Sequence, residues 1–163
     1  MARSGPLDST ERQLVTDLYP SLRRFASVVS PPEDDPNDLV QEALVRTLRR
    51  GPLGRLDDPG AYLRRAIYNL AAGSRRSLAR RRTALSRLGV PAAAPEEHSW
   101  DVQELLALPP RARAVLFLRV IEGRPFAEIA ELVGGSQVAV RATASRARRR
   151  LRDMIEEDRR GTA

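Results

Sequence analysis

Apolar residues recur at helical spacing along most of this chain, and no long alternation of apolar and polar positions is present. Leu14, Leu18, Leu22, Phe25 and Val29 form the first such series. Steps of three and four residues are typical of one face of an α-helix. The pattern predicts an all-α fold, with helices over residues 9–29, 36–50, 59–82, 101–108, 111–122, 124–133 and 137–152.

Capping signals precede the first three helices. These signals are Asp8 or Ser9, Asp35 followed by Pro36, and Asp58 followed by Pro59. A side-chain oxygen at the N-cap and a proline at the first helical position both favour a helix start. Pro20 predicts a kink or short break in the first helix, and Gly73-Ser74 predicts a bend in the third.

Periodicity is lost over residues 83–100, which are rich in proline, alanine and glycine. Such a composition is typical of a linker. We therefore expect two small helical domains, over residues 8–84 and 101–157, joined by a flexible linker over residues 85–100. The single tryptophan, Trp100, is expected to anchor the start of the second domain.

The stretch from Arg124 to Arg152 predicts two helices joined by a tight turn. Gly134-Gly135 stops the first helix, and Ser136 can cap the second. The first helix has an apolar face of Phe126, Ile129, Ala130 and Val133, and the second has a stripe of Val140, Ala144, Ala147 and Leu151. The opposite arc of the second helix carries Gln137, Val138, Arg141, Ala142, Ser145, Arg146 and Arg149. Small residues and arginines suit the major groove of DNA, although a helical hairpin with a solvated basic face has the same pattern.

Charge is distributed unevenly. The formal net charge is +7, and all 28 basic residues are arginine. Residues 61–90 hold eight arginines and no acid, whereas residues 1–60 hold eight arginines and ten acids. Together with the basic stretch from Arg141 to Arg152, this gives two candidate surfaces for a polyanion.

The first basic segment also contains aromatic and amide side chains. Tyr62, Arg65, Tyr68, Asn69, Arg75 and Arg76 belong to this segment. Arginines bind phosphates, rings stack on bases and an amide can read a base edge, so the segment suits single-stranded nucleic acid. The plainer reading is a helix with a basic C-terminal end, but eight arginines exceed what a helix dipole needs.

Other chemistry has little support in the sequence. There is no cysteine, so thiolate metal sites and disulfides are excluded, and the single histidine, His98, lies in a Pro/Ala/Glu stretch. Glu33, Asp34 and Asp35 precede a helix and are expected to cap it rather than to bind a metal. We expect no cofactor, no metal and no catalytic residue. No apolar run reaches membrane-spanning length and no signal-peptide core is present, which predicts a cytoplasmic protein without membrane insertion.

Three segments stand out in the sequence: residues 38–42 read DLVQE, residues 62–70 read YLRRAIYNL, and residues 108–134 read LPPRARAVLFLRVIEGRPFAEIAELVG. In this order, they resemble segments of the extracytoplasmic-function (group IV) sigma factors of the sigma-70 superfamily. Residues 38–42, DLVQE, are similar to the family's signature in the helix that docks on core RNA polymerase. Residues 62–70, YLRRAIYNL, are similar to its WLxRIARNL segment. Residues 108–134 resemble LPPRxRxVLxLRxxEGLSYxEIAxxLG.

The resemblance implies an RNA polymerase sigma subunit that directs promoter-specific transcription initiation and is not an enzyme. Docking on the β′ clamp helices would use Asp38, Leu39, Gln41, Glu42 and Val45, and the apolar face around Leu116 and Phe117 would reach the β flap. The protein would bind the −10 element through Tyr62, Arg65, Tyr68, Asn69, Arg75 and Arg76. Asn69 would lie beside a pocket for a flipped-out base. The −35 element would bind Ser136, Gln137, Val138, Arg141, Thr143, Ser145, Arg146 and Arg149. An anti-sigma factor is a further partner that the resemblance implies.

The chain departs from the family pattern at several of these positions. Tyr62 stands where tryptophan is usual, and Gly73 where aspartate is frequent. In the last helix, Val138 replaces a glycine, Thr143 an arginine and Ser145 a larger residue. Val138 and Thr143 are predicted to contact thymine methyl groups, because both are small and carry methyl groups near the DNA-facing arc.

Two other functions compete with this interpretation. A stand-alone dimeric helix-turn-helix regulator accounts for residues 124–152 but leaves the DLVQE helix and the first basic segment without a role. An enzyme using Asp57-Asp58 or Glu96-Glu97 would need positioned carboxylates, and adjacent acids in Pro/Gly turns are poorly suited to that. The DLVQE residues, on one face of the helix predicted over residues 36–50, are also compatible with an ordinary solvated surface that binds no partner.

Overall fold

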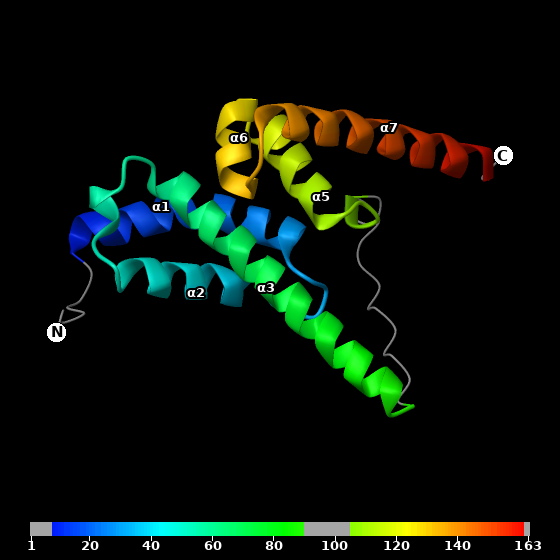
Figure 1. The fold of residues 1–163 in the computed structure, drawn as a ribbon. Helices are drawn as coiled ribbons and strands as arrows, with labels where there is room; N and C mark the ends of the chain where they lie inside the picture. The colour runs from blue at the N-terminus through cyan, green and yellow to red at the C-terminus, as the bar shows by residue number, and fades with distance from the viewer. Residues whose placement is uncertain (1–7, 90–104, 162–163) are drawn as a thin grey trace. The chain divides into compact units, whose positions relative to one another are not determined.

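The computed structural model describes residues 8–89 and 105–161, and its described part is entirely helical (Figure 1), as the apolar periodicity predicted. The chain divides into two compact units, residues 1–96 and 97–163. The expected roles of His98 and Trp100, and most of the expected linker, lie outside the described residues. No helix in the described part is long and apolar enough to cross a membrane.

The first unit consists of three helices that pack pairwise against one another, α1 (Ser9–Val29), α2 (Pro36–Leu48) and α3 (Pro59–Arg87), with a short 3-10 turn η1 (Leu53–Arg55). Its fully buried side chains come from all four elements and include Leu22, Phe25, Val40, Leu53, Leu63 and Ile67. The apolar stripes of the three helices therefore form one core.

The predicted helix starts are confirmed. The carboxylate of Asp8 accepts a hydrogen bond from the Glu11 amide at 2.7 Å, and that of Asp58 accepts from the Ala61 amide at 2.8 Å. Asp35 accepts from the Asn37 amide at 2.8 Å, with Pro36 in the first turn. Each carboxylate satisfies an amide that has no partner within its helix.

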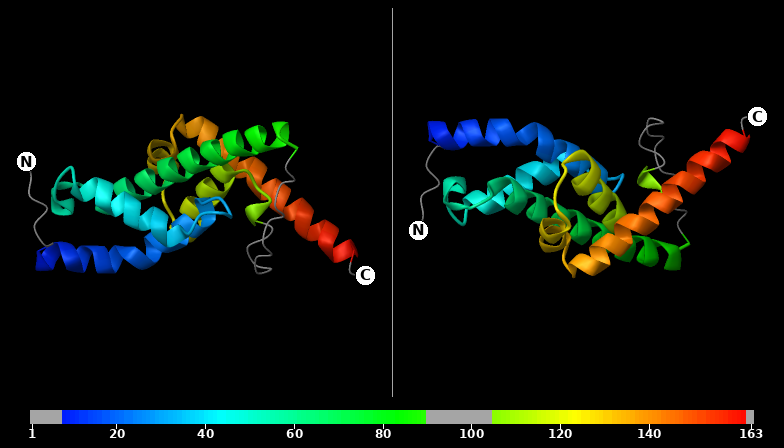
Figure 2. Two further views of the ribbon diagram at one scale, coloured as in Figure 1. Left: turned by 90° about the horizontal axis from the view of Figure 1, so that it is seen from below. Right: turned by 90° about the horizontal axis from the view of Figure 1, so that it is seen from above.

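Two residues that predicted irregular helices lie inside continuous ones, so the short break considered at Pro20 is absent. Pro20 lies inside α1 without breaking it, because Leu22, Phe25 and Val29 beyond it are buried in the core. Gly73 lies inside a continuous α3, which runs to Arg87 rather than ending near residue 82 (Figures 1 and 2). An ion pair between Arg82 and Glu33 joins the late part of α3 to the loop before α2.

The second unit is built from α5 (Pro110–Leu116), the π-helical turn η2 (Phe117–Ile121), α6 (Phe126–Val133) and α7 (Gln137–Gly161). Its buried side chains include Leu108, Val115, Leu118, Ile129, Val140 and Ala147. Helix α7 runs nine residues beyond the expected end at Arg152.

The π-helical turn corrects an expectation about the apolar residues Leu116 and Phe117. The Glu122 amide donates to the Phe117 carbonyl, five residues back, at 3.2 Å. Leu116 and Phe117 are buried, so they cannot form the expected surface for the β flap, whereas Val120 and Ile121 are exposed. The wider turn changes which side chains face inward, and helical periodicity alone does not predict it.

Candidate nucleic-acid interfaces

A hollow of about 430 Å³ lies between α2 and α3 in the first unit. Of the residues predicted to bind the −10 element, Tyr62, Arg65 and Asn69 line it, together with Arg46, Thr47, Arg50, Ala66 and Leu70. None of the eight described residues that line this hollow carries a carboxylate, and three carry a guanidinium group. Such a hollow can accept an aromatic base beside a phosphate.

The α2 side of the hollow was missed in the sequence analysis. Arg50 donates from Nη1 to the Tyr62 hydroxyl at 3.2 Å, which ties the end of α2 to α3. Arg46 forms an exposed ion pair with Glu42, one helical turn earlier. The spacing of four residues between Glu42 and Arg46 predicts such a pair from the sequence. The contact of α2 with α3 could not be predicted in this way, because it joins residues that are far apart in the chain.

The other predicted −10 residues do not line this hollow. Arg75 donates from Nη1 to the carbonyl of Val29 at the C-terminal end of α1, and burial lowers the pKa of its guanidinium, with Tyr68 raising it and Arg76 lowering it further. Arg76 itself is exposed and Tyr68 is half-buried. Arg75 therefore joins α1 to α3 and is poorly placed to contact a DNA strand.

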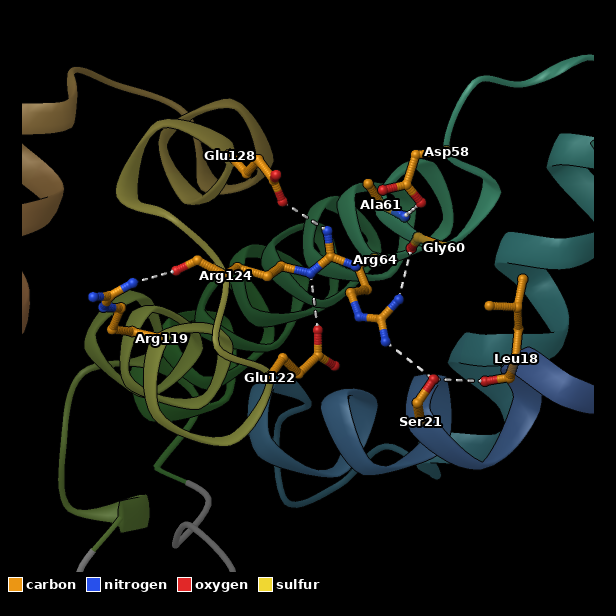
Figure 3. Close-up of polar contacts among 10 residues, drawn as sticks. All are labelled: Leu18, Ser21, Asp58, Gly60, Ala61, Arg64, Arg119, Glu122, Arg124 and Glu128. Carbon is orange, nitrogen blue, oxygen red and sulfur yellow. Dashed lines mark hydrogen bonds and ion pairs between the residues drawn. The ribbon is translucent and has the colours of Figure 1, made fainter.

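A second arginine of α3 is also internal. Arg64 is 5% exposed and donates to the Gly60 carbonyl and to the Ser21 hydroxyl, both at 3.0 Å. The Ser21 hydroxyl in turn donates to the Leu18 carbonyl at 2.9 Å, as Figure 3 shows. Arg64 thus joins α1 to the first turn of α3, beside the exposed Arg65.

The predicted docking face of α2 is largely at the surface. Asp38, Gln41 and Glu42 are exposed, and Val45 is 43% exposed. Leu39 is an exception, because it is buried at 9% exposure and packs inward. The available face therefore consists of polar side chains and one valine.

In the second unit, the turn between α6 and α7 is fixed by its glycines and by an arginine. Gly134 has φ +79° and Gly135 has φ +103°, a region that favours glycine. Arg111 donates to the carbonyls of Val133 and Gly134, and the Ser136 hydroxyl accepts from the Ala139 amide at 3.1 Å. The predicted helix-turn-helix geometry and the Ser136 cap are present.

The outer face of α7 presents most of the predicted −35 residues. Ser136, Gln137, Arg141, Ser145, Arg146 and Arg149 are exposed, and Val138 is 75% exposed. Thr143 is half-buried, and its hydroxyl donates to the Ala139 carbonyl at 2.9 Å. Val138 is thus better placed than Thr143 for an external contact.

Arg141 is held on one side by an aromatic ring. Its Cζ lies 4.8 Å from the ring centroid of Phe126, and the Cζ of Arg119 lies 4.7 Å from the same centroid. A hollow of about 450 Å³ begins at this ring and is lined by Phe126, Arg141, Ala144, Ser145, Arg148, Arg149 and Arg152. Phe126 was expected only as a core residue, and Arg148 and Arg152 were not predicted as site residues.

Comparison with known proteins agrees with both units. The family model "Sigma-70 region 2" matches residues 14–82, and "Sigma-70, region 4" matches residues 102–151. These spans contain the α2–α3 hollow and the helix-turn-helix, respectively.

Two individual proteins are similar over most of the chain. A probable RNA polymerase sigma factor, RfaY, from Xanthomonas campestris pv. campestris is 29% identical over 160 residues, which cover 88% of this chain and 40% of that protein. The sigma factor RpoE from Bartonella quintana, crystallised with the anti-sigma factor NepR, is 24% identical, with a TM-score of 0.73 over 89% of this chain and 96% of that one. The first relative is thus much longer than this chain, and the second shares its fold. With region 2 and region 4 matched in order, the chain belongs to the sigma-70 family of sigma factors and is of the extracytoplasmic-function type.

Proposed function

We propose that this protein is a dissociable RNA polymerase sigma subunit that works in the cytoplasm with core polymerase. It would dock through the exposed α2 face, hold the melted −10 strand at the α2–α3 hollow and bind the −35 duplex with α7. It would supply specificity without bond chemistry. The observation that carries the proposal is the presence, in one chain, of a hollow lined by Tyr62, Asn69 and three arginines and of a capped helix-turn-helix.

The −10 assignment rests on the chemistry of the hollow. Extruding a base from a duplex costs a few kcal/mol of stacking, which contacts to the flipped base must offset. The Tyr62 ring offers a stacking surface, the Asn69 amide offers a donor and an acceptor, and Arg46, Arg50 and Arg65 offer positive charge to the backbone.

The docking assignment rests on exposure. Asp38, Gln41, Glu42 and Val45 form an exposed surface on α2, and aliphatic contact flanked by carboxylates suits a basic helical partner such as the β′ clamp helices. An anti-sigma factor is a further partner in this proposal, since the similar protein from Bartonella quintana was crystallised with one.

Co-elution with core polymerase tests the proposal without knowledge of the promoter. The purified chain, mixed with bacterial core RNA polymerase, is expected to form a stoichiometric complex that a known sigma subunit displaces. Joint substitution Asp38→Ala, Gln41→Ala and Glu42→Ala should abolish the complex while the thermal unfolding of the chain stays the same.

A matched control removes two carboxylates elsewhere. Glu156 and Glu157 are exposed on α7, and their joint replacement by alanine should leave the complex intact. Undiminished binding by the α2 variant would refute the docking face. A chain that forms no complex, elutes as a dimer and shifts duplex DNA would instead be a stand-alone regulator.

A further inference from the structure

The contact between Phe126 and Arg141 joins the first helix of the helix-turn-helix to the second. Phe126 is the first residue of α6, and Arg141 lies in the second turn of α7. A guanidinium within about 6 Å of a ring centroid is attracted by the negative face of the ring, and Arg141 lies at 4.8 Å. The ring therefore restricts where an otherwise exposed, long side chain can point.

The backbone on either side of Pro125, just before Phe126, is held by a polar network, which Figure 3 shows. Arg119, which also lies over the ring at 4.7 Å, donates from Nη1 to the carbonyl of Arg124 at 3.0 Å. Arg124 in turn pairs with Glu122 at 3.0 Å and with Glu128 at 3.2 Å. Because these contacts fix the chain on both sides of Pro125, the start of α6 is a rigid support for Phe126.

The hollow beside Phe126 concentrates positive charge. Arg141, Arg148, Arg149 and Arg152 all line it, with the Ser145 hydroxyl and the small side chain of Ala144, and none of these described lining residues is acidic. Four guanidinium groups around one hollow repel one another unless an anion lies between them. Guanidinium groups bind phosphate oxygens with parallel hydrogen bonds.

The positions of Arg148 and Arg152 along α7 favour phosphate over base contact. The N-terminal residues of a recognition helix reach base edges, and Arg148 and Arg152 lie about 16 and 22 Å along the axis from Gln137 at 1.5 Å per residue. Residues so far along the helix lie beyond the part that enters the groove. At that distance they are near the sugar-phosphate backbone rather than the base edges.

We propose that this hollow is a phosphate-binding site for the backbone of the −35 duplex, and that Phe126 is a positioning residue that holds Arg141 in it. The inference rests on the proposed function, since it takes DNA as the ligand. It adds Arg148 and Arg152 to the DNA contacts. It also assigns Arg141 to the backbone, because Arg141 is held over Phe126 and lines the same hollow as these two arginines.

The salt dependence of DNA binding tests this assignment with the full chain and a random-sequence duplex. Each phosphate contact contributes about one unit to the slope of log Kobs against log salt. Arg148→Gln and Arg152→Gln are each expected to lower the slope by about 1, whereas Arg159→Gln, with the same change of charge at an exposed site near the end of α7, should change it by much less.

A double-mutant cycle tests the role of Phe126. Phe126→Leu, which keeps an apolar side chain, should lower the slope and the affinity, and Phe126→Tyr, which keeps the ring, should behave as the parent. In an Arg141→Gln background, Phe126→Leu should have no further effect on the slope, because the side chain that it positions is gone. Thermal unfolding of each variant separates loss of fold from loss of positioning.

The outcomes are distinct. If the parent binds DNA with a salt-dependent affinity but the Arg148 and Arg152 variants match Arg159→Gln, the phosphate site is refuted and the proposed function stands. If Phe126→Leu lowers affinity equally with and without Arg141, the ring acts through the fold and the positioning role is refuted. If the parent binds no DNA, this inference fails, and the proposed function is then decided separately by co-elution with core polymerase.

Discussion

Arginine residues that look alike in the sequence have different surroundings in this protein. Arg64 is buried between α1 and α3, whereas its neighbour Arg65 is exposed and lines the α2–α3 hollow. Arg75 contacts the end of α1, whereas Arg76 is exposed. Composition and charge patterning identified the basic segment correctly, but they could not separate these pairs, because the difference depends on which helix face meets another helix.

The adjacent pair Arg64 and Arg65 gives the sharpest prediction at this scale. Arg64→Ala removes hydrogen bonds from a charged donor to Gly60 and Ser21 and should lower the free energy of unfolding by about 2 kcal/mol. Arg65→Ala should change it by less than about 0.5 kcal/mol and instead weaken binding to single-stranded DNA. Thermal unfolding and fluorescence anisotropy measure the two effects, and equal destabilisation by both variants would contradict the distinction.

Asn69 allows a functional prediction. Under the proposed function, Asn69→Ala removes a hydrogen-bonding partner of the flipped base and should reduce transcription from a duplex promoter about tenfold, equivalent to 1.4 kcal/mol. A template that is already melted around the −10 element should be much less affected, since its base no longer has to leave a duplex stack before it can flip. Abortive transcription on the two templates is the measurement, and the same loss on both would exclude the role.

At the scale of helices, local signals worked where the residues act locally. The caps at Asp8, Asp35 and Asp58 and the glycine turn before Ser136 are present as predicted. Prediction failed at the end of α3, which lies at Arg87 rather than near residue 82, and at η2, where the backbone becomes π-helical. The short break considered at Pro20 is also absent, because the residues beyond it are buried in the core. Part of each site was also missed. Arg46 and Arg50 line the α2–α3 hollow, whose other wall is α3, and Arg148 and Arg152 line the hollow that begins at Phe126 of α6.

Two glycines of α3 should respond in opposite ways to a methyl group. A Cβ at Gly73 would have its nearest neighbour, Arg76 Nη2, at 3.9 Å, whereas a Cβ at Gly60 would lie 3.0 Å from Arg64 Nη1 and 3.3 Å from Asp58 Oδ1. Gly73→Ala should therefore raise the free energy of unfolding by roughly 0.5–1 kcal/mol, the usual gain within a helix. Gly60→Ala should lower it, because the methyl group crowds the buried arginine. Chemical denaturation of both variants checks the signs.

At the scale of the whole molecule, the two units have separate cores. The buried residues of α1, α2 and α3 belong to one, and those of α5, α6 and α7 to the other. The sequence predicted this organisation from the loss of periodicity after residue 83, although α3 continues to Arg87. A core of its own is what a unit needs to fold alone.

A fragment of residues 1–89 should therefore fold without the second unit. We expect cooperative unfolding with a midpoint within a few degrees of the corresponding transition in the full chain, since the buried side chains of α1, α2 and α3 form one core inside the fragment. Circular dichroism during heating is the measurement. A fragment without a cooperative transition would show that its stability depends on the second unit.

Because α3 is continuous through Gly73, it fixes the distance between the α2–α3 hollow and the end of the helix. From Asn69 to the end of the helix at Arg87, a rise of 1.5 Å per residue gives about 27 Å. That length corresponds to about eight base pairs of duplex DNA at 3.4 Å each. The point at which the chain leaves α3 is thus set at a constant distance from the α2–α3 hollow. Under the proposed function, adaptation to promoters with different spacing between the −10 and −35 elements would occur beyond Arg87.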